Sequence, residues 1–256
     1  MSDARSRKAQ QRQVDRLVVE FGRKRDSVSL FLDQLFLAVS TSPKLVPHVH
    51  SFKKRVKDAD HLREKLLRKA QECAETNREF DVVPSELLTR ITDLAGMRIL
   101  HLYTRQIEDI DKALREIFAE HKYDLLEGPF ARTWDDESRE FFRKCHIRRE
   151  KSPSLYTSVH YIVGSASRTK ITCEVQVRTL MEEVWGEVDH ALNYPHPSES
   201  LACREQIKVL ARITSSATRL VDSIFATRID YEVGRKSDRA VAPREKSAAA
   251  KGRRSR

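Results

Sequence analysis

The segment that decides the fold reads ITCEVQVRT and spans residues 171–179. It alternates between apolar and polar side chains, as a β-strand does when its two faces meet different surroundings. The apolar face carries Ile171, Cys173, Val175 and Val177. The polar face carries Thr172, Glu174, Gln176 and Arg178. Same-face neighbours lie about 6.6 Å apart, so one strand holds a carboxylate, an amide and a guanidinium in a row.

Carboxylates are uncommon in strands, so the polar face needs an explanation. It could be the solvated face of an antiparallel sheet. It could also be the floor of an active site, with the carboxylate for a metal, the amide for a base edge and the guanidinium for a phosphate. The segment alone leaves both explanations open.

Periodicity in the rest of the chain predicts helices on both sides of several strands. We expect helices over residues 8–40, 58–75, 84–91, 106–121, 180–192 and 198–231. We expect strands over residues 97–103, 123–127, 141–148, 158–164 and 170–178, a polar loop over 128–140, and a short strand or loop over 48–57. This order predicts an α/β (α+β) fold, a mixed sheet flanked by helices with long helices at both ends.

Composition excludes several protein classes. The 256 residues are 39% hydrophobic and 34% charged, which is typical of a helix-rich globule. No apolar run approaches the roughly 20 residues that span a bilayer, and the first residues lack the apolar core of a secretory signal. The four cysteines form no CxxC pair, which argues against a zinc or redox site and predicts reduced thiols in the cytoplasm.

Positive charge is concentrated at the two ends of the chain. The net charge is +10, of which residues 234–256 contribute +7 and residues 1–25 contribute +5, so the body between them is nearly neutral. The basic ends could contact RNA phosphates, but the overall charge says little about the body. We expect residues 234–256 to form a disordered basic tail.

Two groups of charged residues could bind a metal and phosphates. Asp93 and Glu174 each sit at or beside a predicted strand, and two carboxylates on adjacent strands make a common Mg²⁺ site. The alternative is a turn cap at Asp93 and an ion pair at Glu174. The basic run at residues 53–57, with Lys65 on the next helix, could hold a triphosphate or could simply be a solvated face.

Two further segments could recognise a nucleobase. Tyr156 follows a loop that contains Lys151, and a tyrosine at such a junction can stack on a base, with His160 close behind it on the next strand. The helix after the opening strand carries Trp185, several acids and Asp189, which could read amino groups of a base or could lie in water while the tryptophan packs.

Together, in this order and spacing, the motifs resemble the RelA/SpoT-type nucleotide pyrophosphokinase domain, especially the small single-domain alarmone synthetases. The matching residues are Arg55-Val56-Lys57 with Lys65, Asp93 to Arg98, Tyr156-x-Ser158-x-His160, Glu174-x-Gln176-x-Arg178-Thr179, and Trp185 to Tyr194. The resemblance implies a nucleotidyltransferase-like fold. It also implies transfer of the β,γ-pyrophosphate of ATP to the 3′-hydroxyl of GDP or GTP.

The resemblance also implies a role for each matching residue. Asp93 and Glu174 would hold Mg²⁺, and Glu174 would assist the attacking hydroxyl. On the ATP side, Arg55 and Arg98 would lie near the adenine and Lys57 and Lys65 would hold phosphates. On the acceptor side, Tyr156 would stack on the base, His160 and Gln176 would line the site, and Asp189 would lie near the guanine edge.

One loop departs from the family pattern. The family usually has Gly immediately before the tyrosine and Arg immediately after it, where this chain has Leu155 and Thr157. The departures concern the acceptor, and Lys151 could supply the missing cation. The same ATP site could therefore serve a relative that pyrophosphorylates the 3′ end of tRNA, and a non-catalytic nucleotide- or RNA-binding module is a further alternative.

The predicted organisation has four parts. Residues 1–49 form an N-terminal helical segment, 50–195 the synthetase-like domain, 196–233 a C-terminal helix and 234–256 the basic tail. A homo-oligomer is expected from the resemblance, and no membrane association is expected.

Overall fold

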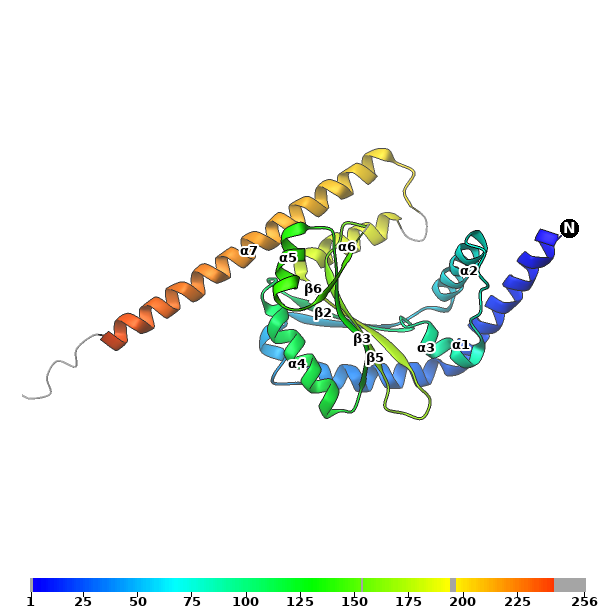
Figure 1. Ribbon diagram of the computed structural model, residues 1–256, viewed down its shortest axis with the longest axis horizontal. Helices are drawn as coiled ribbons and strands as arrows, with labels where there is room; N and C mark the ends of the chain where they lie inside the picture. Colours follow the sequence, from blue (N-terminus) through cyan, green and yellow to red (C-terminus); the bar gives the residue numbers. More distant parts are fainter. Residues whose placement is uncertain (1, 153, 194–196, 242–256) are drawn as a thin grey trace, which may run out of the picture.

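The computed structural model of the chain describes residues 2–152, 154–193 and 197–241 (Figure 1). Its centre is a six-stranded sheet in the order β1-β2-β6-β5-β3-β4. The strands are β1 (Ser51–Val56), β2 (Ala95–His101), β3 (Asp124–Thr133), β4 (Arg148–Lys151), β5 (Ser158–Gly164) and β6 (Thr172–Thr179). Strands β2 and β6 are parallel, as are β3 and β4, and the other neighbours are antiparallel. The expected mixed sheet is confirmed.

Seven α-helices and two short 3₁₀ helices surround the sheet in the described part of the chain. They are α1 (Ser2–Ser40), α2 (Ala59–Glu75), α3 (Leu87–Arg90), α4 (Gln106–Glu120), α5 (Asp136–Lys144), α6 (Leu180–Asn193), α7 (Leu201–Val241), η1 (Val46–His48) and η2 (Pro84–Glu86). Asp58 caps α2 by accepting the Asp60 N–H at 2.8 Å, so this helix begins where its sequence predicts.

The opening strand β6 lies at the centre of the sheet, between β2 and β5. Its apolar side chains are fully buried: Cys173 and Val175 are 0% exposed and Val177 is 1% exposed. They join a core that also contains apolar residues of α1, α2 and α4. The alternation in ITCEVQVRT therefore has the predicted meaning, with one face in the core.

The polar face of the sheet is only partly covered. Glu174 and Gln176 are half-buried, while Arg178 lies beneath α6 and is 6% exposed. Glu174 lies opposite Gly96 of β2 and Ile162 of β5. In Figure 1, α6 and α7 lie on one side of this region and α2 on the other. Helices therefore border the polar face on both sides, and it is not the open solvated face of a sheet.

The segment between β3 and β4 was predicted wrongly. Strand β3 continues to Thr133, and residues expected to form a loop and a strand form helix α5 instead. Asp135 caps α5 by accepting the Ser138 N–H at 2.9 Å, and Asp136 and Glu137 lie in the first turn, where the helix dipole favours negative charge. The cap and the two acids of the first turn favour a helix more strongly than the apolar pair at residues 141–142 favours a strand.

The two long terminal helices are present. Helix α7 continues to Val241, past the boundary expected at residue 233, so the first part of the predicted tail is helical. The rest of that predicted tail, residues 242–256, lies outside the described residues. Ser215 donates a hydrogen bond to Asp135 at 2.7 Å, and this contact holds α7 against the start of α5.

Two further features of the structure, its thiols and the polarity of its helices, concern the predicted class of protein. All four cysteines are unpaired, as expected. Among residues 2–152, 154–193 and 197–241, we find no helix long and apolar enough to cross a membrane.

Candidate active site

Two neighbouring pockets lie on the polar face of the sheet. The first, which we call the β1 pocket, is lined by residues that include Arg55, Asp93 and Glu174, and has a volume of about 250 Å³. The second, the α6 pocket, is lined by residues that include Tyr156 and Asp189. Arg98, Gln176 and His190 line both pockets. Seven of the predicted site residues therefore line one or both of two adjoining pockets, while Lys57, Lys65, Lys151 and His160 line neither.

Asp93 is held between two lysines at the entrance to β2. Its Oδ2 lies 2.8 Å from the Lys57 ammonium and 2.7 Å from the Lys65 ammonium. Burial alone would raise the pKa of Asp93, but Lys65 and Lys57 together lower it to about 2. The other oxygen, Oδ1, is buried and has no hydrogen-bond partner in the structure. The carboxylate is ionised and keeps one oxygen available for another ligand.

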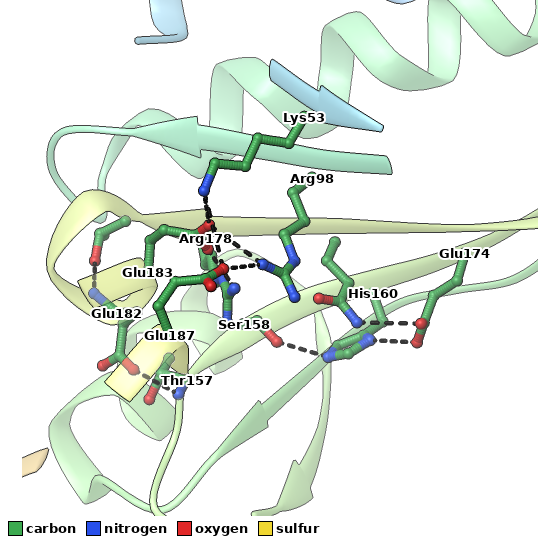
Figure 2. A network of polar contacts seen from close by, with 12 residues as sticks. Lys53, Arg98, Thr157, Ser158, His160, Glu174, Arg178, Glu182, Glu183 and Glu187 are labelled. Atoms are coloured by element: carbon green, nitrogen blue, oxygen red, sulfur yellow. Dashed lines mark hydrogen bonds and ion pairs between the residues drawn. The ribbon is translucent and has the colours of Figure 1, made fainter. Parts of the chain in front are cut away.

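Glu174 is oriented by two neighbours on the sheet. His160 Nδ1 lies 3.0 Å from Oε1, and the Gln176 amide donates to Oε2 at 3.1 Å (Figure 2). Burial alone would raise the pKa of Glu174, but the hydrogen bond and charge of His160 lower it. Because an ionised carboxylate only accepts hydrogen bonds, His160 Nδ1 carries the proton between them. The carboxylate is therefore ionised and held in one orientation by a neighbour on each of its oxygens.

His160 itself lies below the pockets and lines neither of them. It is 1% exposed and its ring stacks on Phe130 with 5.3 Å between centroids. Its Nε2 lies 2.6 Å from the Ser158 hydroxyl and 3.2 Å from the Tyr156 hydroxyl. The structure thus places His160 between Glu174 and the Tyr156 loop, as a residue that orients both, and this differs from the expected direct place in the acceptor site.

A cluster of ion pairs joins α6 to the sheet between the two pockets. Glu183 Oε1 lies 2.7 Å from Lys53 and 3.2 Å from Arg98, and its Oε2 contacts Arg178 (Figure 2). Arg98 also lies 2.5 Å from Glu187. Burial alone would raise the pKa of Glu183, but the hydrogen bond from Lys53 and the charges of Arg178 and Arg98 lower it. Arg178, whose guanidinium the sequence offered for a phosphate, thus forms a buried ion pair with α6.

The loop before β5 carries the departures from the family pattern. Leu155 has φ of 58°, in the left-handed region that costs an L-residue about 1 kcal/mol and that glycine adopts freely. Its side chain packs against a small cluster of Trp185, Ile207 and Ala211. The Thr157 N–H donates to Glu182 at 3.0 Å. The loop keeps the positive-φ conformation that glycine adopts freely, and packing against this cluster holds Leu155 in that conformation.

Arg132 is a residue that the sequence analysis missed. It lies on β3 opposite Ser158 of β5, and its guanidinium lies over the Phe130 ring, 5.3 Å from the centroid. Burial alone would lower the pKa of Arg132, but the neighbouring Tyr156 side chain and the charges of Glu174 and Glu150 raise it. A cation therefore stands beside the tyrosine. Only the pairing of β3 with β5 reveals it, since no local motif marks this arginine.

Lys151 does not join the other predicted residues. It lies exposed on the edge strand β4 and lines neither pocket. By contrast, Asp189 lines the α6 pocket, where its Oδ1 accepts the Asn193 amide at 2.9 Å. Arg132 and not Lys151 thus lies beside Tyr156, because the edge strand leaves its lysine exposed to solvent.

Comparison with known protein families shows to which family this chain belongs. The model of the region found in RelA/SpoT proteins matches residues 54–199, which is more than half of the chain. The chain belongs to the RelA/SpoT family. The matched region contains every lining residue of both pockets except Lys53 of the β1 pocket.

Individual relatives are distant in sequence. GTP pyrophosphokinase YjbM of Bacillus subtilis is 24% identical over 152 residues, which are 57% of this chain and 62% of that protein. The chain therefore spans about three fifths of the length of this curated relative.

Two solved structures of small alarmone synthetase 1 from Bacillus subtilis share the fold. The one bound to its product pppGpp has 20% identity and a TM-score of 0.53, covering 86% of this chain and 98% of that chain. The one bound to AMPCPP has 18% identity and a TM-score of 0.51, covering 86% and 99%. The expected fold is confirmed by these likenesses.

Proposed function

We propose that this protein transfers the β,γ-pyrophosphate of ATP to the 3′-hydroxyl of GDP or GTP. The observation that carries the proposal is the pair of adjoining pockets that meet at Gln176, with Glu174 lining the first and Tyr156 the second. The relative YjbM is named a GTP pyrophosphokinase, which supports the proposal. A two-substrate transfer needs this adjacency, since holding both reactants in place supplies much of the rate.

The β1 pocket is the proposed ATP site. Arg55 and Arg98 line it and would lie near the adenine, where guanidinium groups can stack on a base. Lys57 and Lys65 do not line it, but both contact Asp93, which does, and they would hold the phosphates. Arg98 is paired with Glu183 and Glu187 through its Nη1, and these contacts leave the flat face of the guanidinium for stacking.

The two acidic residues fit a magnesium ion. Asp93 offers the unpartnered Oδ1, and Glu174 lines the same pocket. The Asp93 charge raises the pKa of Glu174, one of several influences on that carboxyl, so the carboxylates are close enough to repel each other. Hard oxygen ligands of this kind suit Mg²⁺, which usually binds through one or two carboxylates and substrate phosphates. When bound, Mg²⁺ would neutralise charge on the transferred phosphates.

The α6 pocket is the proposed acceptor site. Tyr156 would stack on the guanine, while Gln176 and Asp189 would accept or donate hydrogen bonds along its edge. Arg132 lines neither pocket but lies beside Tyr156, so it would supply a cation at the edge of the acceptor site in place of the family arginine that Thr157 replaces. Lys151, exposed on β4, would act only at longer range.

The proposed chemistry needs one proton transfer. The acceptor 3′-oxygen attacks the β-phosphorus of ATP, the bond from that phosphorus to the α,β-bridging oxygen breaks, and AMP leaves. Glu174 accepts the proton of the attacking hydroxyl, and His160 and Gln176 keep the carboxylate turned toward it. Lys57 and Lys65 offset charge on the phosphates, because such transfer depends mainly on alignment and electrostatics.

A labelling experiment tests the proposal. The purified full chain is incubated with Mg²⁺ and γ-labelled ATP, together with GDP, GTP or tRNA. We expect label on the guanine nucleotides. Label on tRNA alone would show a tRNA pyrophosphokinase, and nucleotide binding without any transfer would show a non-catalytic module; either outcome rejects the proposal.

A matched pair of variants identifies the proton acceptor. Glu174→Gln is expected to reduce transfer at least a hundredfold, since a general base contributes about 10² to 10⁴ in rate. Glu205→Gln removes an exposed carboxylate of α7 and is expected to leave transfer unchanged. A fully active Glu174→Gln variant would contradict the role of Glu174.

The remaining partners are also proposals. Unpaired thiols support a cytoplasmic protein. A homo-oligomer stays a prediction, which size-exclusion chromatography with light scattering would test. Contact of the basic ends with RNA also stays a prediction, which binding at increasing salt would test.

A further inference from the structure

Glu182 is a buried carboxyl group that the proposed reaction does not use. It lies in the first turn of α6, is 5% exposed, and lines neither the β1 pocket nor the α6 pocket. It therefore faces neither proposed substrate. Burial raises its pKa to about 7, so holding it ionised in this place is unfavourable. A glutamate is almost never fully buried without a partner, so the partner of Glu182 indicates its role.

That partner is the backbone of the acceptor loop, residues 154–157. Glu182 Oε2 accepts the N–H of Thr157 at 3.0 Å (Figure 2). This N–H belongs to the peptide unit between Tyr156 and Thr157, and Tyr156 is the ring proposed to stack on the guanine. Because a peptide unit is planar, fixing its N–H also fixes the Tyr156 carbonyl group and limits the direction of the tyrosine side chain. One hydrogen bond thus acts on the orientation of the proposed stacking ring.

A second residue of α6 contacts the same loop. The Trp185 ring is parallel to the Tyr156 ring within 5°, with 6.3 Å between centroids, and Leu155 packs against the cluster that contains this tryptophan. Trp185 is itself fixed, since its indole N–H donates to the Ile207 carbonyl oxygen at 3.2 Å. Residues three positions apart lie on one face of a helix, so Glu182 and Trp185 together form one surface against the loop. Helix α6 therefore contacts three consecutive loop residues.

The loop does not keep this shape through its own conformational preference. Leu155 has φ of 58°, which residues with a side chain rarely adopt. The Thr157 hydroxyl lies 2.9 Å from the Thr133 hydroxyl, a contact that fixes the Thr157 side chain but does not engage its N–H. The carboxyl group of Glu182 can accept the N–H in either protonation state, since a protonated carboxyl keeps acceptor capacity. The contact with Glu182 is thus the one that fixes this peptide unit.

Space behind the loop would allow it to move if this contact were lost. Glu182 and Thr157 both line a cavity of about 200 Å³, which lies between the ends of β5 and β6 and the helices α5 and α7. Protein interiors are otherwise closely packed, so a loop with a cavity behind it can change conformation at little cost in packing. The hydrogen bond from Thr157 to Glu182 therefore opposes a movement that the surrounding structure would permit.

We propose that Glu182 is a positioning residue for the acceptor: it fixes the peptide unit between Tyr156 and Thr157 and so sets the direction of the Tyr156 ring. The inference rests on the proposed function, which assigns the acceptor base to Tyr156. Without the carboxyl group the loop populates other conformations, and the apparent affinity for the acceptor falls in proportion to the fraction that stays competent. Saturating acceptor restores the competent loop, so the maximal rate is kept. The β1 pocket, which Glu182 does not line, keeps its affinity for ATP.

Two substitutions of Glu182 separate its acceptor oxygen from its size. Glu182→Met keeps an unbranched side chain but loses the oxygen, and should raise the KM for GDP about tenfold while the KM for ATP and kcat stay within about twofold of wild type. Glu182→Gln keeps an acceptor oxygen and should hold the KM for GDP within about threefold of wild type. Partial unfolding would instead remove active molecules, which lowers kcat and leaves both KM values unchanged.

Amide hydrogen exchange of the full chain without substrate, followed by nuclear magnetic resonance, gives a readout that does not depend on the reaction. Exchange at the Thr157 amide should be at least tenfold faster in Glu182→Met than in wild type and in Glu182→Gln. Asp222→Asn is the matched control, because Asp222 lines the same cavity but accepts the Arg105 backbone N–H at 3.2 Å, away from the loop. It should change neither Thr157 exchange nor the KM for GDP.

The two measurements distinguish the failure of this proposal from the failure of the proposed function. A wild type that transfers nothing to GDP or GTP rejects the proposed function, and Thr157 exchange then decides whether Glu182 fixes the loop. Unchanged Thr157 exchange in Glu182→Met, an unchanged KM for GDP, equal rises in both KM values, or an equal effect in Glu182→Gln overturns the proposal. Glu182→Ala, which also removes the oxygens, decides the matter by the same criteria if Glu182→Met does not fold.

Discussion

Replacement of Asp93 by asparagine tests the charge cluster at the entrance to β2. The carboxylate lies 2.8 Å from Lys57 and 2.7 Å from Lys65, and its side chain is 17% exposed. Its pKa is lowered from 3.8 to about 2. At about 1.36 kcal/mol per unit, this difference corresponds to roughly 2.4 kcal/mol of folding free energy at neutral pH. Asp93→Asn should lose about this amount and should also lose activity.

The sign of the pH dependence follows from the direction of the shift. Because the folded pKa lies below the unfolded value, the stabilisation is complete above about pH 4 and is lost as the pH falls toward 2. At pH 3, both states are partly protonated and about 1.3 kcal/mol remains. The difference in stability between wild type and variant should therefore shrink by about half between pH 7 and pH 3.

Urea unfolding followed by far-ultraviolet circular dichroism at the two pH values measures both differences. Asp124→Asn is the matched control, because Asp124 pairs with Lys170 at an exposed position and should cost less than about 1 kcal/mol. A wild-type advantage over Asp93→Asn that stays the same from pH 7 to pH 3 would refute the electrostatic explanation.

Three further predictions concern the acceptor side. Leu155→Gly should be about 1 kcal/mol more stable than Leu155→Ala, a melting-temperature difference of roughly 2–4 °C, because both lose packing but only glycine relieves the positive φ; an alanine variant of equal or greater stability contradicts this. Arg132→Met should raise the KM for GDP about tenfold and leave the KM for ATP unchanged. Steady-state kinetics with both substrates varied measure the two values, and an equal rise in both would contradict a role on the acceptor side. Burial raises the pKa of Glu182 to about 7 from 4.5, so its ionisation destabilises the fold as the pH rises through this range. From pH 5 to pH 8, the free energy of unfolding of Glu182→Gln, measured in urea, should therefore rise relative to that of the wild type by up to about 3 kcal/mol. A difference that stays constant over this range would contradict the prediction.

The parts of the fold that follow from local pattern were predictable. Strand β6 was predictable because its period-two alternation separates Cys173, Val175 and Val177 from their polar neighbours, and one face is buried accordingly. Helix α2 was predictable from its cap at Asp58. Helix α5 was missed because the apolar pair Phe141-Phe142 suits a strand as well as a helix, and the capping role of Asp135 was not considered.

The placement of individual site residues depends on pairing between distant strands. Arg132 reaches Tyr156 because β3 pairs with β5 in a register that sets Arg132 opposite Ser158, and no periodicity reports this register. His160 was expected among the acceptor contacts, but its ring stacks on Phe130 and its Nδ1 contacts Glu174. Lys151 was expected beside the acceptor, but its strand forms the outer edge of the sheet.

The small cluster beneath the acceptor loop has a spectroscopic consequence. The chain contains two tryptophans, and both Trp134 and Trp185 belong to this cluster, with Trp185 stacked parallel to Tyr156 at 6.3 Å between centroids. All indole emission of the protein thus originates next to the loop and α7, away from the main core. Emission would report occupancy of this region without any added label. During unfolding, a fluorescence transition that precedes the dichroism transition would show that this corner opens while the sheet is still folded.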